Sequence, residues 1–80
     1  MRKTDLIQLR ELLQDSFNNT IIPENILNLK MDDFTEWDSL GNFNLLLLAE
    51  EKFKIKFSIE EMSHIKSVEQ LIFVIEKLKN

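Results

Sequence analysis

The sequence predicts an all-α protein, a small four-helix bundle formed by a single domain over residues 1–80. Hydrophobic residues make up 44% of the chain, whereas Gly and Pro each occur once, so helices meet few interruptions. Apolar residues recur at helical spacing in several segments, and two serines stand where capping boxes begin helices. The expected bundle has a long loop between its first and second helices and a short third helix.

The first helix is expected over Thr4 to Phe17. Its apolar residues recur at three- and four-residue steps and form one stripe, made of Leu6, Leu9, Leu13 and Phe17 and widened by Leu12. Asparagines and then Pro23 follow this stripe, so the helix is expected to end near Asn18.

Residues 19–38 are hydrophobic but lack a clear period, which predicts a long loop packed against the helices, with a short turn near Glu24 to Leu27. The loop carries an acidic cluster formed by Asp32, Asp33, Glu36 and Asp38. Its spacing lacks the glycine and glutamate positions of a calcium loop. We interpret the cluster as a solvated acidic loop, with weak cation binding and recognition of a basic partner as alternatives.

The second helix is expected from Ser39 to Phe53, and Asp38 is suited to cap its first turn. No residue between Gly41 and Ala49 is charged, and the apolar side chains point almost all round the helix. Such a helix usually lies at the centre of a core. In so small a bundle, however, part of its surface is expected to face a ligand or a partner.

The last part of the chain predicts a connector and two helices. Residues from Phe53 to Phe57 alternate apolar side chains with lysines, which predicts an extended connector that buries one face. A short helix is expected over about Ile59 to His64, and a longer one from Val68 to Leu78. Capping-box pairs mark both starts: Ser58 with Glu61, and Ser67 with Gln70.

Composition disfavours several function classes. The chain has no cysteine, so any thiol chemistry must come from a cofactor. A net charge of −4 disfavours nucleic acid and suits transient docking on basic patches of other proteins. No run of about 20 apolar residues and no signal-like start are present, so we expect a cytoplasmic protein without membrane insertion.

No pattern of catalytic or metal-ligating residues stands out, and we expect neither an enzyme nor a metal site. The single histidine, His64, has no neighbouring nucleophile and is expected on the surface or at a helix end. The remaining candidate is Ser39, at a helix start after a long loop, where a modifying enzyme could reach its hydroxyl and the helix dipole favours an attached phosphate. From these residues alone, a plain helix-capping serine remains the alternative.

The sequence Asp38-Ser39-Leu40 resembles the Asp-Ser-Leu motif of the acyl carrier protein family, whose serine is esterified by 4'-phosphopantetheine. The resemblance covers nearly the whole chain and is most specific from Trp37 to Leu71. The first helix matches the family only as a generic amphipathic helix. The pattern after the motif matches the family in order and spacing: Phe43, Leu45, Leu46, Leu47, then Glu50-Glu51-Lys52-Phe53, Ile55, Phe57, Glu60-Glu61, Ile65, Ser67-Val68, Leu71 and Ile75.

The resemblance implies that Ser39 carries a covalent 4'-phosphopantetheine arm donated by coenzyme A, and that Asp38 positions the serine and contributes to recognition. The arm would supply the thiol that the chain lacks and hold acyl intermediates as thioesters for delivery to other enzymes, as in fatty acid biosynthesis and lipid metabolism. The implied partners are a phosphopantetheinyl transferase, an acyl or aminoacyl ligase, and downstream synthases or transferases. The carrier is expected to be a monomer.

Side chains near the motif have expected roles as well. Leu40, Phe43 and Leu47 lie on one side of the second helix and are the expected partner contacts, with a place in the core as the alternative. Trp37 is expected to anchor the loop by burial, with contact to the arm as the alternative. Two further leucines are expected in the interior or in an acyl pocket: Leu45 and Leu48.

The chain departs from the family where many members carry acidic residues, because it has Gly41, Asn42 and Asn44 there. A less acidic partner face favours a dedicated pathway with its own ligase over standard fatty acid synthesis. Trp37 and Gly41 are similar to residues of small stand-alone carriers in specialised or surface-polysaccharide pathways. Gly41 is also expected to cost the helix up to about 1 kcal/mol relative to alanine and to loosen its first turn.

Two alternatives remain open. The same fold could carry an amino acid, as in aminoacyl, peptidyl and D-alanyl carriers. The chain could instead be a helical interaction domain that is never modified and that docks through its leucine-rich second helix. A hydrolase or transferase is disfavoured, because the sequence offers no catalytic constellation.

Overall fold

The computed structural model describes residues 2–79 and contains four helices in that range. They are α1 (Lys3–Ser16), α2 (Ser39–Phe53), α3 (Ile59–His64) and α4 (Val68–Lys79). β-Pairing within residues 2–79 amounts to one antiparallel bridge between Lys30 and Ser67, and no strand forms there. The predicted all-α class is confirmed, and the helix ends differ from the predicted ones by about one residue.

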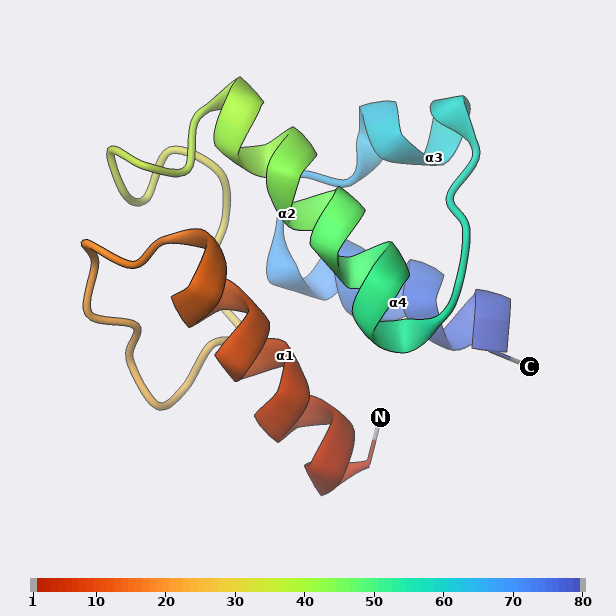
Figure 1. Cartoon of the computed structure of the whole chain (residues 1–80), viewed down its shortest axis with the longest axis horizontal. Helices are drawn as coiled ribbons and strands as arrows, with labels where there is room; N and C mark the ends of the chain where they lie inside the picture. The colour runs from red at the N-terminus through yellow and green to blue at the C-terminus, as the bar shows by residue number, and fades with distance from the viewer. Residues whose placement is uncertain (1, 80) are drawn as a thin grey trace.

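Helices α1 and α2 pack against each other and run in opposite directions, with α3 and α4 following on the other side of α2 in the view of Figure 1. The segment 17–38 winds along one side of the molecule from the end of α1 to the start of α2. At the far end of α2, the Lys79 ammonium lies 3.5 Å from Asp5 and 5.6 Å from the centre of the Phe53 ring. The start of α2 therefore lies at the opposite end of the molecule from both chain termini (Figure 1).

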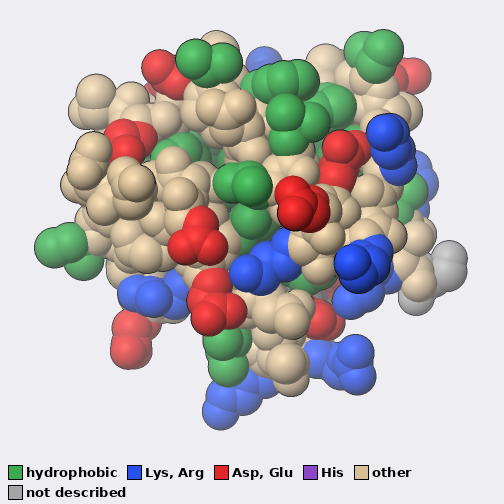
Figure 2. All heavy atoms as spheres, viewed as in Figure 1, with side chains coloured by type: hydrophobic (Ala, Val, Ile, Leu, Met, Phe, Trp, Pro, Cys, Tyr) green, Lys and Arg blue, Asp and Glu red, His purple; other side chains and the backbone are tan. Residues whose placement is uncertain are grey.

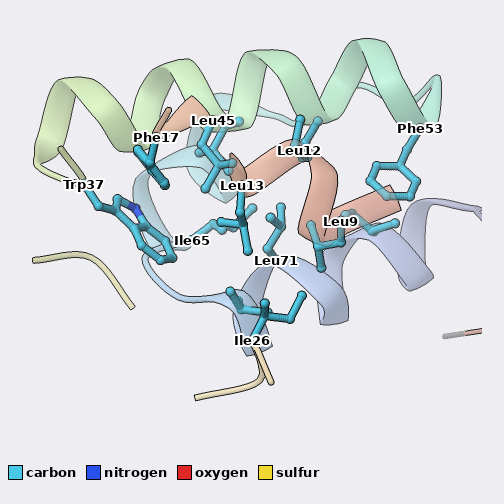
Figure 3. Packing of buried hydrophobic residues seen from close by; sticks show 14 of the residues in the cluster. Leu9, Leu12, Leu13, Phe17, Ile26, Trp37, Leu45, Phe53, Ile65 and Leu71 are labelled. Carbon is cyan, nitrogen blue, oxygen red and sulfur yellow. The ribbon is translucent and has the colours of Figure 1, made fainter. Parts of the chain in front are cut away.

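One hydrophobic core lies between α1, α2 and α4 (Figure 3). Only one face of α2 is buried, and Leu45, Leu46 and Ala49 lie on it. Helix α3 contributes no buried residue of its own, and it is held by the buried side chains of Phe57 and Ile65 on either side of it. The expectation that part of the apolar surface of α2 stays outside the core is confirmed, and contact of that part with a ligand or a partner stays a prediction.

The long connection between α1 and α2 is held by polar side chains of α1. Arg10 donates hydrogen bonds to the carbonyl oxygens of Ile22 and Pro23, the latter at 3.1 Å. One turn further along α1, the Gln14 amide donates to the carbonyl oxygen of Thr20 at 2.8 Å. These bonds fix backbone carbonyls that no helix or sheet satisfies. The connection is thus bonded to the side of α1 through Arg10 and Gln14, two polar residues to which the sequence assigned no role.

The short turn in this connection lies slightly later than predicted. Glu24 is at a bend, but the closing bond runs from the Leu29 N–H to the Ile26 carbonyl oxygen at 3.1 Å. The turn therefore follows the buried Ile26, which fixes where the backbone can reverse.

The connector between α2 and α3 agrees with the alternating pattern. Lys54 adopts the left-handed conformation that ends α2, with φ 56° and ψ 49°. Phe53 and Phe57 are buried on either side of it, whereas Lys54 and Lys56 are exposed. The predicted one-sided burial of this segment is confirmed.

The two predicted capping boxes form differently. At α3 the box is complete, because the Ser58 hydroxyl accepts from the Glu61 N–H at 3.0 Å and the Glu61 carboxylate accepts from the Ser58 N–H at 2.9 Å. At α4 the Gln70 N–H reaches the Ser67 hydroxyl at 3.2 Å. The Gln70 side-chain oxygen, however, accepts from the Lys66 N–H at 2.8 Å and from the Ser67 hydroxyl at 3.3 Å, rather than from the Ser67 N–H.

The capping carboxylate of Glu61 should make stability depend on pH. The Ser58 N–H, with a smaller contribution from the Lys77 ammonium 3.6 Å away, holds the pKa of Glu61 below its ordinary 4.5. A lowered folded-state pKa means that this contribution is complete above the unfolded-state pKa and is lost as the pH falls through the folded-state value. We expect Glu61→Gln to melt at a lower temperature than wild type at pH 7, with the difference shrinking below about pH 4.5.

Thermal melts of both proteins between pH 7 and pH 3 check this expectation. The wild-type melting curve alone is insufficient, because Lys30 lowers the pKa of Asp33 in the same direction. The difference between the two proteins isolates Glu61. A difference that stays constant over the whole pH range would contradict the role assigned to its charge.

Candidate functional site

Ser39 is the first residue of α2, and its exposed side chain does not cap the helix. The cap is Asp38, whose carboxylate accepts from the Gly41 N–H at 2.8 Å, while its carbonyl oxygen accepts from the Asn42 N–H at 2.8 Å. The alternative in which Ser39 serves as an ordinary helix cap is therefore wrong. The predicted capping role of Asp38 is confirmed.

The Ser39 hydroxyl has no hydrogen-bond partner within residues 2–79. It extends from the positive end of a 15-residue helix, where backbone N–H groups and the helix dipole stabilise negative charge. The side chain is thus accessible to another protein, and its oxygen is not engaged in holding the fold. A phosphate ester at this position would fit the local electrostatics.

Directly before the exposed motif, Trp37 is fully buried, with 0% of its surface exposed. Its ring stacks on Phe17, directly after α1, with centroids 5.3 Å apart (Figure 3). Its centroid also lies 6.1 Å from that of the Phe34 ring. The indole N–H donates to the side-chain oxygen of Asn42 at 2.9 Å. The prediction that Trp37 anchors the loop is confirmed, and the indole offers no exposed surface for the alternative contact with an arm.

Asn42 was expected on the partner face, and this prediction is wrong. Its side chain is 7% exposed and donates from Nδ2 to the carbonyl oxygen of Ile65 at 2.8 Å. The helical spacing places Asn42 on the same face as Leu45 and Leu46, which is the buried one. This spacing, together with a nearby indole that needs an acceptor, is the signal in the sequence that could have located Asn42 correctly.

Gly41 has a packing role that its sequence context did not reveal. The carbonyl oxygen of Glu36 crosses so close to Gly41 that a Cβ there would collide with it, and that Cβ would lie 3.3 Å from Asp38 Oδ1. The Glu36 carboxylate accepts from the Thr20 hydroxyl at 2.7 Å, which holds the loop in place. Gly41 is therefore required for the close approach of the Glu36 carbonyl oxygen, and the expected loosening of the first turn stays a prediction.

The acidic cluster divides into separate local roles. Asp33 accepts from the Lys30 N–H at 2.9 Å, Glu36 accepts from Thr20 in the connection after α1, and Asp38 caps α2. Within residues 2–79 no group of three or more His, Cys, Asp or Glu side chains is placed to hold a metal ion. His64 ends α3, is exposed, and lies with Nδ1 2.8 Å from the Glu60 carbonyl oxygen, so its predicted helix-end role is confirmed.

An apolar stripe on α2 begins next to Ser39. Leu40, Phe43 and Leu47, which we call the α2 stripe, are 69%, 49% and 43% exposed. The alternative that placed them in the core is therefore wrong. Figure 2 shows hydrophobic side chains along the course of α2 with acidic side chains beside them. The stripe is available for contact with another molecule.

The two leucines expected in the interior behave differently. Leu45 is 1% exposed and belongs to the core, as predicted. Leu48 is 38% exposed, so its predicted burial is wrong, because the face of α2 that meets the core runs through Leu45 and Ala49. Leu48 borders an open depression of about 340 Å³ whose other lining residues are mostly charged. This depression does not have the apolar lining of an acyl pocket.

Comparisons of the chain with protein-family models, curated proteins and solved structures gave no match. No helix within residues 2–79 has the length and apolar character needed to cross a membrane.

Proposed function

We propose that the protein is an acyl carrier protein, in which Ser39 bears a 4'-phosphopantetheine arm that presents acyl intermediates to partner enzymes. The observation that carries the proposal is the exposed, unpartnered Ser39 hydroxyl at the first residue of a capped helix. It stands within the motif Asp38-Ser39-Leu40, which resembles the attachment site of carrier proteins. The four helices and the long connection before α2 support the bundle arrangement of that family.

The chain contributes a nucleophile and a fixed backbone to its own modification. The Ser39 oxygen would form a bond to the phosphorus of coenzyme A that bears the pantetheine, the bond from that phosphorus to the adenosine bisphosphate would break, and the transferase would take the hydroxyl proton. The Asp38 carboxylate is bonded to the Gly41 N–H, so we assign it a positioning role rather than that of a base. The new phosphodiester charge at the helix start would gain about 0.3–1 kcal/mol from the dipole. When bound, the arm supplies the thiol that forms thioesters.

The α2 stripe is the proposed docking surface for the transferase, an acyl or aminoacyl ligase, and downstream enzymes. Its first member, Leu40, directly follows Ser39, so an enzyme that covers the stripe also covers the modified residue. Tethering then raises the effective concentration of the cargo at the docked enzyme. Asn42 is buried and does not contribute to the surface near the motif, but Asn44 is exposed there and is also uncharged. This weak charge favours a specialised pathway over housekeeping fatty acid synthesis, and an aminoacyl cargo on the same arm is the second candidate.

Mass spectrometry tests the proposal directly. We expect the purified protein, incubated with coenzyme A and a broad-specificity phosphopantetheinyl transferase, to gain the mass of one phosphopantetheine group. Ser39→Ala should gain nothing, because the accepting oxygen is gone. Ser63→Ala is the matched control, since Ser63 is also exposed and helical, and it should be modified like wild type.

Failure of wild type to gain this mass with several transferases would rule out the carrier proposal. It would favour the unmodified interaction domain, for which the exposed α2 stripe is the supporting observation. A mass gain that persists in Ser39→Ala would show that the site is misassigned.

A further inference from the structure

A buried network of hydrogen bonds centred on Asn42 holds the backbone around Ser39. The Asn42 N–H donates to the Asp38 carbonyl oxygen at 2.8 Å, and its side-chain oxygen accepts from the Trp37 indole at 2.9 Å. Its side-chain nitrogen donates to the Ile65 carbonyl oxygen at 2.8 Å. Asn42 is thus hydrogen-bonded to Trp37 and Asp38, the two residues before Ser39, and to Ile65, the residue after α3. We call these contacts the Asn42 network.

This network joins three segments that are far apart in the sequence. Trp37 stacks on Phe17 at the end of α1, while Ile65 occupies the cap position between α3 and α4. Asn42 itself lies one turn into α2. The start of α2 is therefore fixed relative to α1 and to the α3–α4 junction, although Ser39 itself is exposed.

Burial makes these bonds selective for one arrangement. Asn42 and Trp37 are 7% and 0% exposed, so water cannot easily replace a lost partner, and an unpaired donor or acceptor there is costly. No buried side-chain nitrogen or oxygen within the described residues lacks a hydrogen bond. Any movement of the Trp37–Asp38 backbone that displaced Ser39 would break contacts that have no substitute.

We propose that Asn42 is the positioning residue of the Ser39 site: it holds the backbone that carries Ser39, and thereby places the serine for attack on the donor phosphorus. This inference rests on the proposed carrier function. Asn42 would touch neither the donor nor the reacting atoms, and its effect would pass through the backbone of residues 37 and 38. Displacement of a reacting group by about 1 Å from a change outside the chemistry can cost on the order of 100-fold in rate.

The test compares Asn42→Leu with wild type in steady-state kinetics of phosphopantetheinyl transfer from coenzyme A. Leucine has a similar size but can make neither side-chain hydrogen bond of the network. We expect kcat to fall about 10- to 100-fold. KM for the carrier should stay within about threefold, because the exposed α2 stripe that docks the transferase is unchanged. A purely structural role would not separate kcat from KM in this way.

Two further variants keep the test decisive if Asn42→Leu is poorly folded. Trp37→Phe keeps a stacked aromatic ring but removes the indole donor, and it should lower kcat less than Asn42→Leu does. Ile75→Val removes a buried methyl group in α4, outside the network, and should lower the melting temperature with kcat unchanged. All assays are run at a temperature where circular dichroism shows every variant to be folded.

Wild-type kcat in both network variants would overturn the inference, as would an equal loss of kcat in Ile75→Val. Hydrogen exchange does not require modification of Ser39, so it distinguishes failure of the positioning role of Asn42 from failure of the carrier function. We expect the Gly41 and Asn42 amides, which donate to Asp38, to exchange at least about tenfold faster in Asn42→Leu than in Ile75→Val. If wild type is not modified by any transferase, the carrier proposal fails and with it the positioning role. Faster exchange would then show only that the network holds the backbone.

Discussion

Replacing Trp37 with alanine is expected to lower the free energy of unfolding by about 3–5 kcal/mol, the usual cost of truncating a buried large aromatic side chain. The side chain is fully buried, and its stack on Phe17 would be lost. The oxygen of Asn42 would also lose its donor, and a buried unsatisfied acceptor adds about 1–3 kcal/mol. Since small domains are stable by only about 5–15 kcal/mol, we expect a largely unfolded or strongly destabilised protein. Urea titration followed by circular dichroism measures the change.

Two variants calibrate this result. Trp37→Phe keeps an aromatic ring and should cost about 1–3 kcal/mol for the orphaned Asn42 oxygen. Phe73→Ala truncates an aromatic side chain that is 71% exposed, so its effect should stay within about 0.5 kcal/mol. The role of Trp37 as the loop anchor would be refuted if its alanine variant were no less stable than Phe73→Ala.

The helices were predictable because their signals are local. Apolar spacing and capping residues act within a few positions, so α2 and α3 begin and end where the sequence places them. The exposed stripe on α2 was predictable for a related reason. A helix that is apolar all round has more hydrophobic surface than a small core can cover, and Phe43 is one of the residues left outside.

The hydrogen bonds that hold the backbone near Ser39 were not predictable in the same way, because they join segments that are far apart in the sequence. Glu36 meets Thr20 across 16 positions, and Asn42 meets Ile65 across 23. In the sequence, the spacing of Asn42 indicates the buried face of α2 but not the partner in Ile65, and Glu36 resembles one more acid in a loop. Their partners become identifiable only when packing brings the end of α1 and the α3–α4 junction to the start of α2. The place of Ser39 at the start of α2, the Asp38 cap and the Trp37 anchor were therefore predictable, whereas the contacts of Asn42 and Glu36 were not.

For Gly41→Ala, helix propensity and the observed packing predict changes in stability of opposite sign. Helix propensity alone predicts that Gly41→Ala stabilises the protein by up to about 1 kcal/mol. The structure predicts the reverse, since the added Cβ would collide with the backbone carbonyl oxygen of Glu36. A backbone atom cannot rotate away as a flexible side chain can, and forcing an extra group into a packed site typically costs about 1–3 kcal/mol.

We therefore expect Gly41→Ala to be less stable than wild type in urea titrations, while Asn44→Ala, at an exposed position of the same helix, is slightly more stable. Equal stabilisation by both alanines would mean that the loop does not cross Gly41 as closely as the structure shows.

The collision also has a consequence for the site. Relief of the clash would move Glu36 and, two residues later, the Asp38 cap that precedes Ser39. Loss of stability in Gly41→Ala should therefore be accompanied by slower phosphopantetheine transfer. A rise in stability with slower transfer would instead assign Gly41 to contact with the transferase.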